Sequence, residues 1–184
     1  MNLFYCYSHK DEALRDSLAT HLSVLRRRGL ITEWYDRCIM PGSDWKSSID
    51  TSLESADIVL LLISADFLAS DYCFDVEMQR ALQRHKAGKA AVVPVILRAV
   101  DWSEAPFGDL QALPKDRRPV TSWPDRDEAF VDVTSGLRKL IVELAHRREM
   151  SSVPTGEEES GDPLGPKDEA FGAIRYGAAS TVLG

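Results

Sequence analysis

Cysteine is scarce in the 184-residue chain, and long apolar runs are absent. The three cysteines, Cys6, Cys38 and Cys73, form no CxxC pair, which is typical of a reducing compartment and leaves no recognisable zinc site. The longest apolar run, Ile58 to Ile63, is far shorter than the ~20 residues of a membrane-spanning helix, and no signal-peptide pattern opens the chain. We therefore expect a cytoplasmic protein with neither a metal site nor a membrane partner.

Basic residues are also fewer than acidic ones. The chain has 22 Lys and Arg residues against 29 Asp and Glu residues, which gives a formal net charge of −7. An acidic surface repels phosphate backbones, so the composition argues against direct nucleic-acid binding.

The motifs of several common enzyme classes are missing. Neither G-x-G-x-x-G nor G-x-x-x-x-G-K-[ST] occurs, which argues against a dinucleotide-binding Rossmann site and against a P-loop. A phospho-receiver needs an acceptor Asp after its third strand, where this chain has Ile63-Ser64. No Ser or Cys stands in a recognisable nucleophile elbow, so acyl transfer has no support.

Composition changes near Met150. Residues 151–184 hold six of the 11 glycines and three of the nine prolines, with six acids against two bases. Such a segment buries too little apolar surface to offset its ordering entropy. We therefore expect one domain over residues 1–150, followed by a linker or disordered tail over 151–184.

Strand and helix patterns alternate through the first 150 residues. Five short runs predict strands: Leu3–Tyr7, Thr32–Tyr35, Ile58–Ile63, Ala91–Ile96 and Pro119–Thr121. The third run is apolar without alternation, as in a parallel strand covered on both faces. The stretches between and after the strands predict helices. The first follows Ser8, carries a leucine stripe from Leu14 to Leu25 and stops at Gly29. The others run from about Asp44 to Leu53, from Phe67 to His85 and from Asp127 to Arg148. The alternation predicts a flavodoxin-like α/β three-layer sandwich with a five-stranded parallel sheet in the order 2-1-3-4-5.

The winding of such a sheet predicts where ligands bind. The direction reverses between strands one and three, and ligands occupy the crevice beyond the carboxyl ends of the strands at that point. The loops leaving these strands are Ser8 to Asp11 and Ser64 to Phe67, with the loop Asp36 to Ser43 alongside.

Three stretches together resemble a TIR domain of the bacterial type. They are Phe4-Tyr5-Cys6-Tyr7-Ser8, the loop from Asp36 to Trp45 with Pro41-Gly42, and Ser70-Asp71-Tyr72-Cys73 leading to Glu77. They are similar to the opening strand, the mobile BB loop and the Ser-x-Trp-Cys-x-x-Glu helix of the family, with Tyr72 in place of Trp. The resemblance covers about residues 1–148.

The resemblance implies two activities: cleavage of NAD+ at its nicotinamide–ribose bond in bacterial defence signalling, including antiphage defence, or non-catalytic assembly with other TIR domains. In enzymatic members one glutamate carries the reaction, and that residue here is Glu77. NAD+ is then the substrate, and no cofactor is implied. Because this chain has one residue more than the family spacing, Asp75 stays open as the alternative carboxylate.

Further roles are expected around Glu77. The residues that we expect to contact the substrate are Tyr7, Ser8, Lys10, Trp34, Asp36, Arg37, Trp45 and Tyr72. A structural alternative stays open for three of them: Ser8 as a helix N-cap, and Trp34 and Trp45 as packing residues. The expected partners are NAD+, other TIR domains, and a sensor or effector module beyond the linker in a longer protein. Spacing leaves open whether the product is linear or cyclic ADP-ribose.

Overall fold

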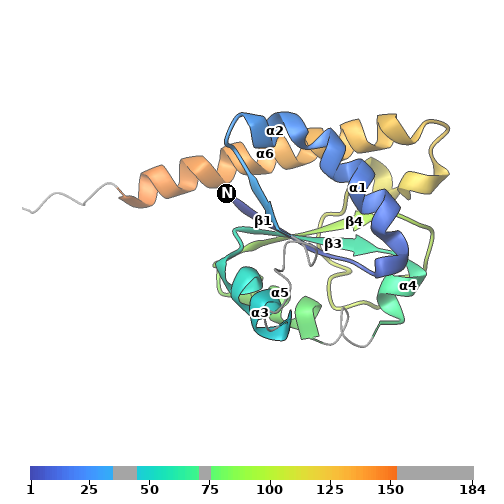
Figure 1. Ribbon diagram of the computed structural model, residues 1–184, viewed down its shortest axis with the longest axis horizontal. Coiled ribbons are helices and arrows are strands. Elements are labelled where there is room, and N and C mark those ends of the chain that lie inside the picture. Colours follow the sequence, from blue (N-terminus) through green and yellow to red (C-terminus); the bar gives the residue numbers. More distant parts are fainter. Residues whose placement is uncertain (35–44, 71–75, 153–184) are drawn as a thin grey trace, which may run out of the picture. The chain divides into compact units, whose positions relative to one another are not determined.

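A parallel sheet of four strands organises the molecule. The computed structural model describes residues 1–34, 45–70 and 76–152. The strands are β1 (Asn2–Cys6), β2 (Thr32–Trp34), β3 (Ile58–Ile63) and β4 (Ala91–Ile96), and they pair in the order β2-β1-β3-β4 (Figure 1). The α/β class, the parallel pairing and the reversal between the first and third strands are as predicted.

The strand β3 forms the centre of the sheet. Its six residues are all buried, and it pairs with β1 from Leu3↔Ile58 to Cys6↔Leu61 and with β4 from Ile58↔Ala91 to Ile63↔Ile96. A strand that is paired on both edges and covered on both faces has no polar position, which explains its unbroken run of Ile, Val and Leu.

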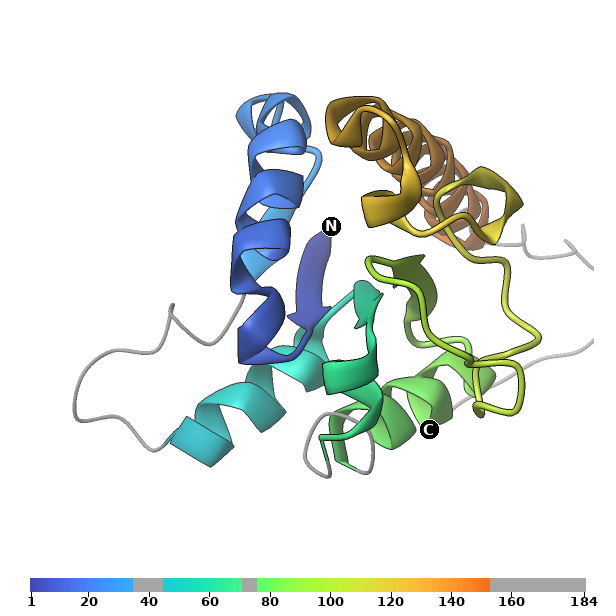
Figure 2. The same cartoon turned by 90° about the vertical axis from the view of Figure 1, so that its right-hand side faces the viewer.

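Helices cover both faces of the sheet (Figure 2). The helices α1 (Glu12–His21), α2 (Ser23–Arg27) and α6 (Arg126–Ser152) lie on one face, where Leu18 of α1, Leu25 of α2 and Leu22 between these helices are part of the core. The helices α3 (Trp45–Ser55), α4 (Ala65–Leu68) and α5 (Gln79–Lys86) lie on the other face. Short 3-10 turns complete the described part: η1 (His9–Asp11), η4 (Lys115–Arg117) and η5 (Val120–Ser122).

Gly29 ends the helical segment formed by α1 and α2, as the sequence predicted. Gly29 has φ +68°, a left-handed conformation that costs glycine little, and the Leu30 amide then donates to the Leu25 carbonyl at 3.0 Å. The chain can therefore turn back at once into β2.

The predicted fifth strand at Pro119–Thr121 is wrong. Residues Val120–Ser122 form the 3-10 turn η5, and Val120 is buried in the core without pairing as a strand. Leu113 instead makes a single parallel bridge to Val95, donating to the Pro94 carbonyl and accepting from the Ile96 amide. Because Pro94 has no N–H to offer on that edge, the pairing does not extend beyond this bridge toward the start of β4.

The predicted helix from Phe67 to His85 is interrupted. The helix α4 ends at Leu68, and the described chain resumes as a π-helical turn over residues 76–78 that leads into α5. The last helix is longer than predicted, because α6 continues to Ser152. The rest of the predicted tail lies outside the described residues, and within those residues no helix is both long and apolar enough to cross a bilayer.

Burial of β3 on both faces predicts a matched pair of mutational losses. Leu60 packs in the core under α1 and α6, and Leu61 packs in the core under α3 and α5. We expect Leu60→Ala and Leu61→Ala each to lower the free energy of unfolding by about 2 to 5 kcal/mol in urea denaturation. The exposed Val142→Ala is the control and should change it by less than about 0.5 kcal/mol. A large loss for only one leucine would contradict the two-sided burial.

Candidate active site

Ion pairs lie beyond the carboxyl ends of the strands, where the sheet reverses direction. Asp11, which follows β1, is buried, and its carboxylate accepts hydrogen bonds from Ser64 Oγ at 2.5 Å and from Arg98 Nε at 2.7 Å. Ser64 Oγ also accepts from the Phe67 amide at 3.1 Å and so caps α4. The ends of β1, β3 and β4 are therefore joined by one hydrogen-bond network, in which Asp11 and Ser64 are buried.

The outer part of this network is a partly exposed carboxylate between two cations. Asp66 accepts from Arg98 at 2.5 Å and from Lys10 at 2.6 Å. Hydrogen bonds from Arg98 first, and from Lys10 second, hold the pKa of Asp66 below its usual value. Bonds to Asp11 and Asp66 in turn raise the pKa of Arg98. Lys10, expected to contact the substrate, is thus already paired within the protein.

Sequence reasoning missed Asp11 and Arg98 as members of this cluster. Asp11 has the spacing of an acid in a first helical turn, and Arg98 carries no motif. Their positions directly after β1 and β4 are the signal, because the carboxyl ends of parallel strands meet at one edge of the sheet.

Glu77 is a buried carboxylate on the α3 and α5 face of the sheet. It lies in the π-helical turn before α5 and is only 7% exposed, while its neighbour Val76 is 43% exposed and Met78 is fully buried. Cys6 Sγ donates a hydrogen bond to Glu77 Oε2 at 2.9 Å. Glu77 is therefore directed toward the carboxyl end of β1, unlike the solvated glutamate typical of a helix surface. Asp75, the alternative carboxylate, lies outside the described residues.

A cavity of about 330 Å³ opens beside Glu77. Its lining combines the α3 side chains Asp50, Leu53 and Glu54 with Val76, Glu77 and Arg80. Its volume is at the lower end of the range of roughly 300 to 1,000 Å³ for ligand pockets. Three carboxylates against one guanidinium favour a ligand group that carries positive charge.

Two arginines of α5 hold α3 in place along this cavity. Arg80 pairs with Glu54, and this hydrogen bond holds the pKa of Glu54 below its usual value. The buried Arg84 donates to the carbonyls of Leu53 and Ala56 at the end of α3. Donors placed on the last carbonyls of a helix satisfy groups that have no partner within the helix. The separation of α3 from α5, and with it the cavity, is fixed by these bonds.

The other expected substrate contacts fall in different places. Tyr7 packs on the opposite face of the sheet, where the Arg15 guanidinium lies 5.1 Å from its ring centre. Ser8 precedes η1, and its backbone carbonyl, not its hydroxyl, accepts from the Asp11 amide at 2.8 Å. Trp34 stacks on Phe4 with ring centres 5.1 Å apart, on the same face as Glu77.

Four expected contacts have no described side chain. Trp45 is the first residue of α3, but its side chain is not described. Asp36, Arg37 and Tyr72 lie outside the described residues. Among the residues that are described, no three His, Cys, Asp or Glu side chains are grouped so as to hold a metal ion.

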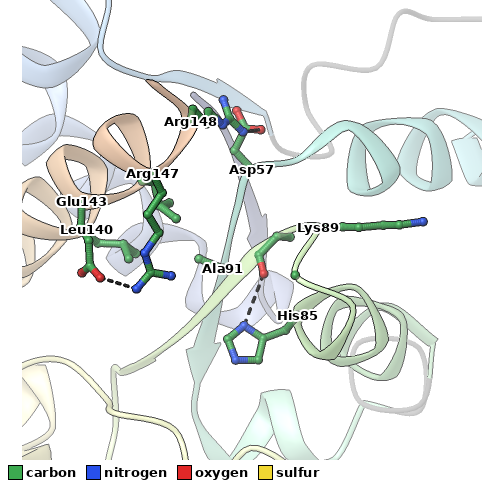
Figure 3. Close-up of a pocket in the computed structure, with 11 residues that line it drawn as sticks. Asp57, His85, Lys89, Ala91, Leu140, Glu143, Arg147 and Arg148 are labelled. Atoms are coloured by element: carbon green, nitrogen blue, oxygen red, sulfur yellow. Dashed lines mark hydrogen bonds and ion pairs between the residues drawn. The ribbon is translucent and has the colours of Figure 1, made fainter. Parts of the chain in front are cut away.

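A larger cavity, of about 620 Å³, lies at the opposite end of the strands (Figure 3). Asp57, just before β3, and Ala91, at the start of β4, line it. The charged side chains of α6 there are paired: Arg148 with Asp57, and Arg147 with Glu143. Because ligands of doubly wound sheets bind toward the carboxyl ends of the strands, the smaller cavity is the better candidate: Glu77, which lines it, bonds to Cys6 at the carboxyl end of β1.

Comparisons with known proteins agree with this architecture. A family model described as TIR domain matches residues 3–132. The uncharacterized protein y4lF of Sinorhizobium fredii (strain NBRC 101917 / NGR234) is 54% identical over 138 residues, which cover 75% of this chain and 43% of that protein. The chain thus spans less than half the length of this relative.

A solved structure shows the same fold at low identity. It is the crystal structure of the TIR domain of the Toll-related receptor TRR-2 from Hydra magnipapillata, with a TM-score of 0.54 and 20% identity. The match covers 74% of this chain and 95% of that one.

The lowered pKa of Asp66 predicts a pH-dependent contribution to stability. Its pKa is lower in the folded than in the unfolded state, so the pairs stabilise the fold above the unfolded value of about 4, and this stabilisation is lost as pH falls through the folded value. We expect Asp66→Asn to be less stable than the wild type at pH 7, and the difference to shrink toward pH ~3. Urea denaturation across this range measures it, and a difference independent of pH would contradict the assignment.

Proposed function

Since the chain belongs to the TIR domain family, we propose that it is an NAD+ nucleosidase that cleaves the nicotinamide–ribose bond through Glu77. One observation carries the proposal. The glutamate marked by the family motif is buried, bonds to the last residue of β1, and lines a cavity between α3 and α5. A glutamate kept only for solubility has no reason to be withdrawn from water, since burying a carboxylate is costly.

The chemistry of NAD+ explains why one carboxylate suffices. Glycosidases use a pair of carboxyl groups because an acid must protonate the departing oxygen. Nicotinamide instead leaves a cationic ring as a neutral molecule, so no acid is required. The remaining task is to stabilise the positive charge that develops on the ribose as the bond breaks.

Glu77 is suited to that task. A fixed carboxylate opposes the oxocarbenium-like charge and accepts hydrogen bonds from ribose hydroxyls, and it binds the transition state more strongly than the ground state. Asp50 and Glu54 add negative potential along the same wall of the cavity. Arg80 stands beside Glu54 and partly neutralises it, which leaves Glu77 as the buried carboxylate of the lining.

The proposed substrate contacts remain predictions. Trp34 is on the same face of the sheet as Glu77, where its ring is already stacked on Phe4. Lys10 and Arg98 are available to phosphate only if the substrate displaces Asp66, since both cations pair with that carboxylate. The complete set stays as proposed from the sequence: Tyr7, Ser8, Lys10, Trp34, Asp36, Arg37, Trp45 and Tyr72.

The second candidate function is a non-catalytic adaptor that acts by assembly with other TIR domains. The internal pairing of Lys10, Asp66 and Arg98 favours it, because a crevice whose cations are neutralised attracts phosphates weakly. TIR domains commonly self-associate, so assembly is compatible with both candidates. Only the enzyme requires a reactive carboxylate.

Replacement of Glu77 by glutamine separates the two candidates. Glu77→Gln keeps the volume of the side chain and removes its negative charge, so we expect the rate of nicotinamide release to fall by at least about 10² to 10³ while the fold survives. Free nicotinamide is measured by chromatography, and folding by thermal denaturation.

Two further substitutions serve as controls for Glu77→Gln. Glu54→Gln removes the same charge from the same cavity at an exposed position, and we expect a far smaller loss. Asp75→Asn tests the alternative carboxylate two residues earlier. If Asp75→Asn abolishes release and Glu77→Gln does not, the assignment moves to Asp75; if neither substitution affects release, no carboxylate of this segment carries the reaction.

A further inference from the structure

We propose that Cys6 is a positioning residue for Glu77: its thiol donates a hydrogen bond that fixes the orientation of the carboxylate. The inference rests on the proposed catalytic role of Glu77. It assigns to the first strand a part in the reaction that neither the family motif around Glu77 nor the substrate contacts expected from the sequence include.

The position of Cys6 makes it a rigid support. Cys6 is the last residue of β1, lies opposite Leu61 of the central strand, and is fully buried. Its neighbours Tyr5 and Tyr7 point to the opposite face of the sheet, so Cys6 is the side chain at the end of β1 that faces α3 and α5. Because the backbone of Cys6 is fixed by strand pairing and its side chain is fully buried, the thiol has little freedom to move.

Glu77, in contrast, comes from a less regular part of the chain. It lies in a π-helical turn, which follows an interruption between α4 and α5. The 2.9 Å contact from Cys6 Sγ to Glu77 Oε2 joins this turn to the sheet across 71 positions of sequence. The bond therefore transfers the rigidity of β1 to the carboxylate.

The chemistry of the pair suits a positioning role. A buried carboxylate requires hydrogen-bond donors, and a thiol is a weak donor that keeps its proton beside a stronger acid. Cys6 thus orients Glu77 without neutralising it, whereas a lysine or arginine in this position would cancel the negative charge that the ribose cation needs. Functional groups must be held within about 0.5 Å of the productive geometry, which gives even a weak bond an effect on rate.

Kinetics of two variants test the role. We expect Cys6→Ala to lower kcat for nicotinamide release by about 10- to 100-fold, the range typical of residues that orient a functional ligand, with KM nearly unchanged. Cys6→Ser retains a donor and should recover most of kcat. If Cys6 only fills space, Ala and Ser reduce kcat alike or Ser is the worse, and the proposal is overturned. Thermal denaturation of each variant identifies losses that come from unfolding.

A spectroscopic measurement tests the bond without activity. The S–H stretching band of Cys6 is isolated as the infrared difference between wild type and Cys6→Ser, and the same difference is taken in a Glu77→Gln background. A neutral amide accepts more weakly than a carboxylate, so the band should move to higher frequency with Glu77→Gln. An unchanged band overturns the hydrogen bond and with it the positioning role.

The two measurements also separate this inference from the proposed function. A band that depends on Glu77 in a protein that releases no nicotinamide would refute the nucleosidase and, with it, the effect of Cys6 on the reaction, while the contact itself stands. Nicotinamide release that depends on Glu77 but is insensitive to Cys6→Ala would refute only the positioning role.

Discussion

The parallel pairing of β1 with β3 is the constraint on which the site depends. It sets Cys6 opposite Leu61 at the reversal of the sheet, so the residues that follow the two strands leave from one edge. On that edge Asp11, Ser64 and Arg98 form the hydrogen-bond network that joins the strand ends. On the α3 and α5 face the same pairing brings Cys6 to Glu77. A slip of one residue would turn Cys6 to the opposite face and separate it from Glu77.

Paired groups fill the reversal point and shift the candidate site toward α3 and α5. In other doubly wound sheets the crevice at this point holds the ligand. Here Asp66 neutralises Lys10 and Arg98, and the described cavity with a buried carboxylate lies beside α3 and α5 instead. The charge of its lining suits a cationic group better than a phosphate. This separation is the physical basis for proposing that the nicotinamide riboside portion of NAD+ binds near Glu77.

Much of the fold is predictable from local sequence, because a strand that is buried on both faces is a continuous apolar run. The runs Ile58–Ile63 and Ala91–Ile96 match the observed strands residue for residue. The prediction of a fifth strand failed because Val120 can be buried equally well in a 3-10 turn. One apolar residue beside proline and hydroxyl residues does not distinguish a strand from such a turn. The edge of β4 pairs instead with Leu113, which lies in a stretch without a strand pattern.

The site was less predictable than the fold. Glu77 was identified through a motif, but its burial and its contact with Cys6 depend on two elements that are far apart in the sequence. The Asp11–Arg98 pair spans 87 positions, and neither residue belongs to a recognisable pattern. From spacing alone, Asp11 looks like an ordinary acid in the first turn of a helix. Spacing does not reveal that Arg98, which follows β4, lies beside it.

The most direct test of the account is the reaction of the purified wild-type protein with NAD+, followed by proton NMR in dilute and in concentrated or crowded samples. If the protein is a nucleosidase, free nicotinamide appears together with linear or cyclic ADP-ribose, and the rate per molecule rises as the protein self-associates. No nicotinamide under any of these conditions, in a sample shown to assemble, would contradict the nucleosidase and leave the adaptor.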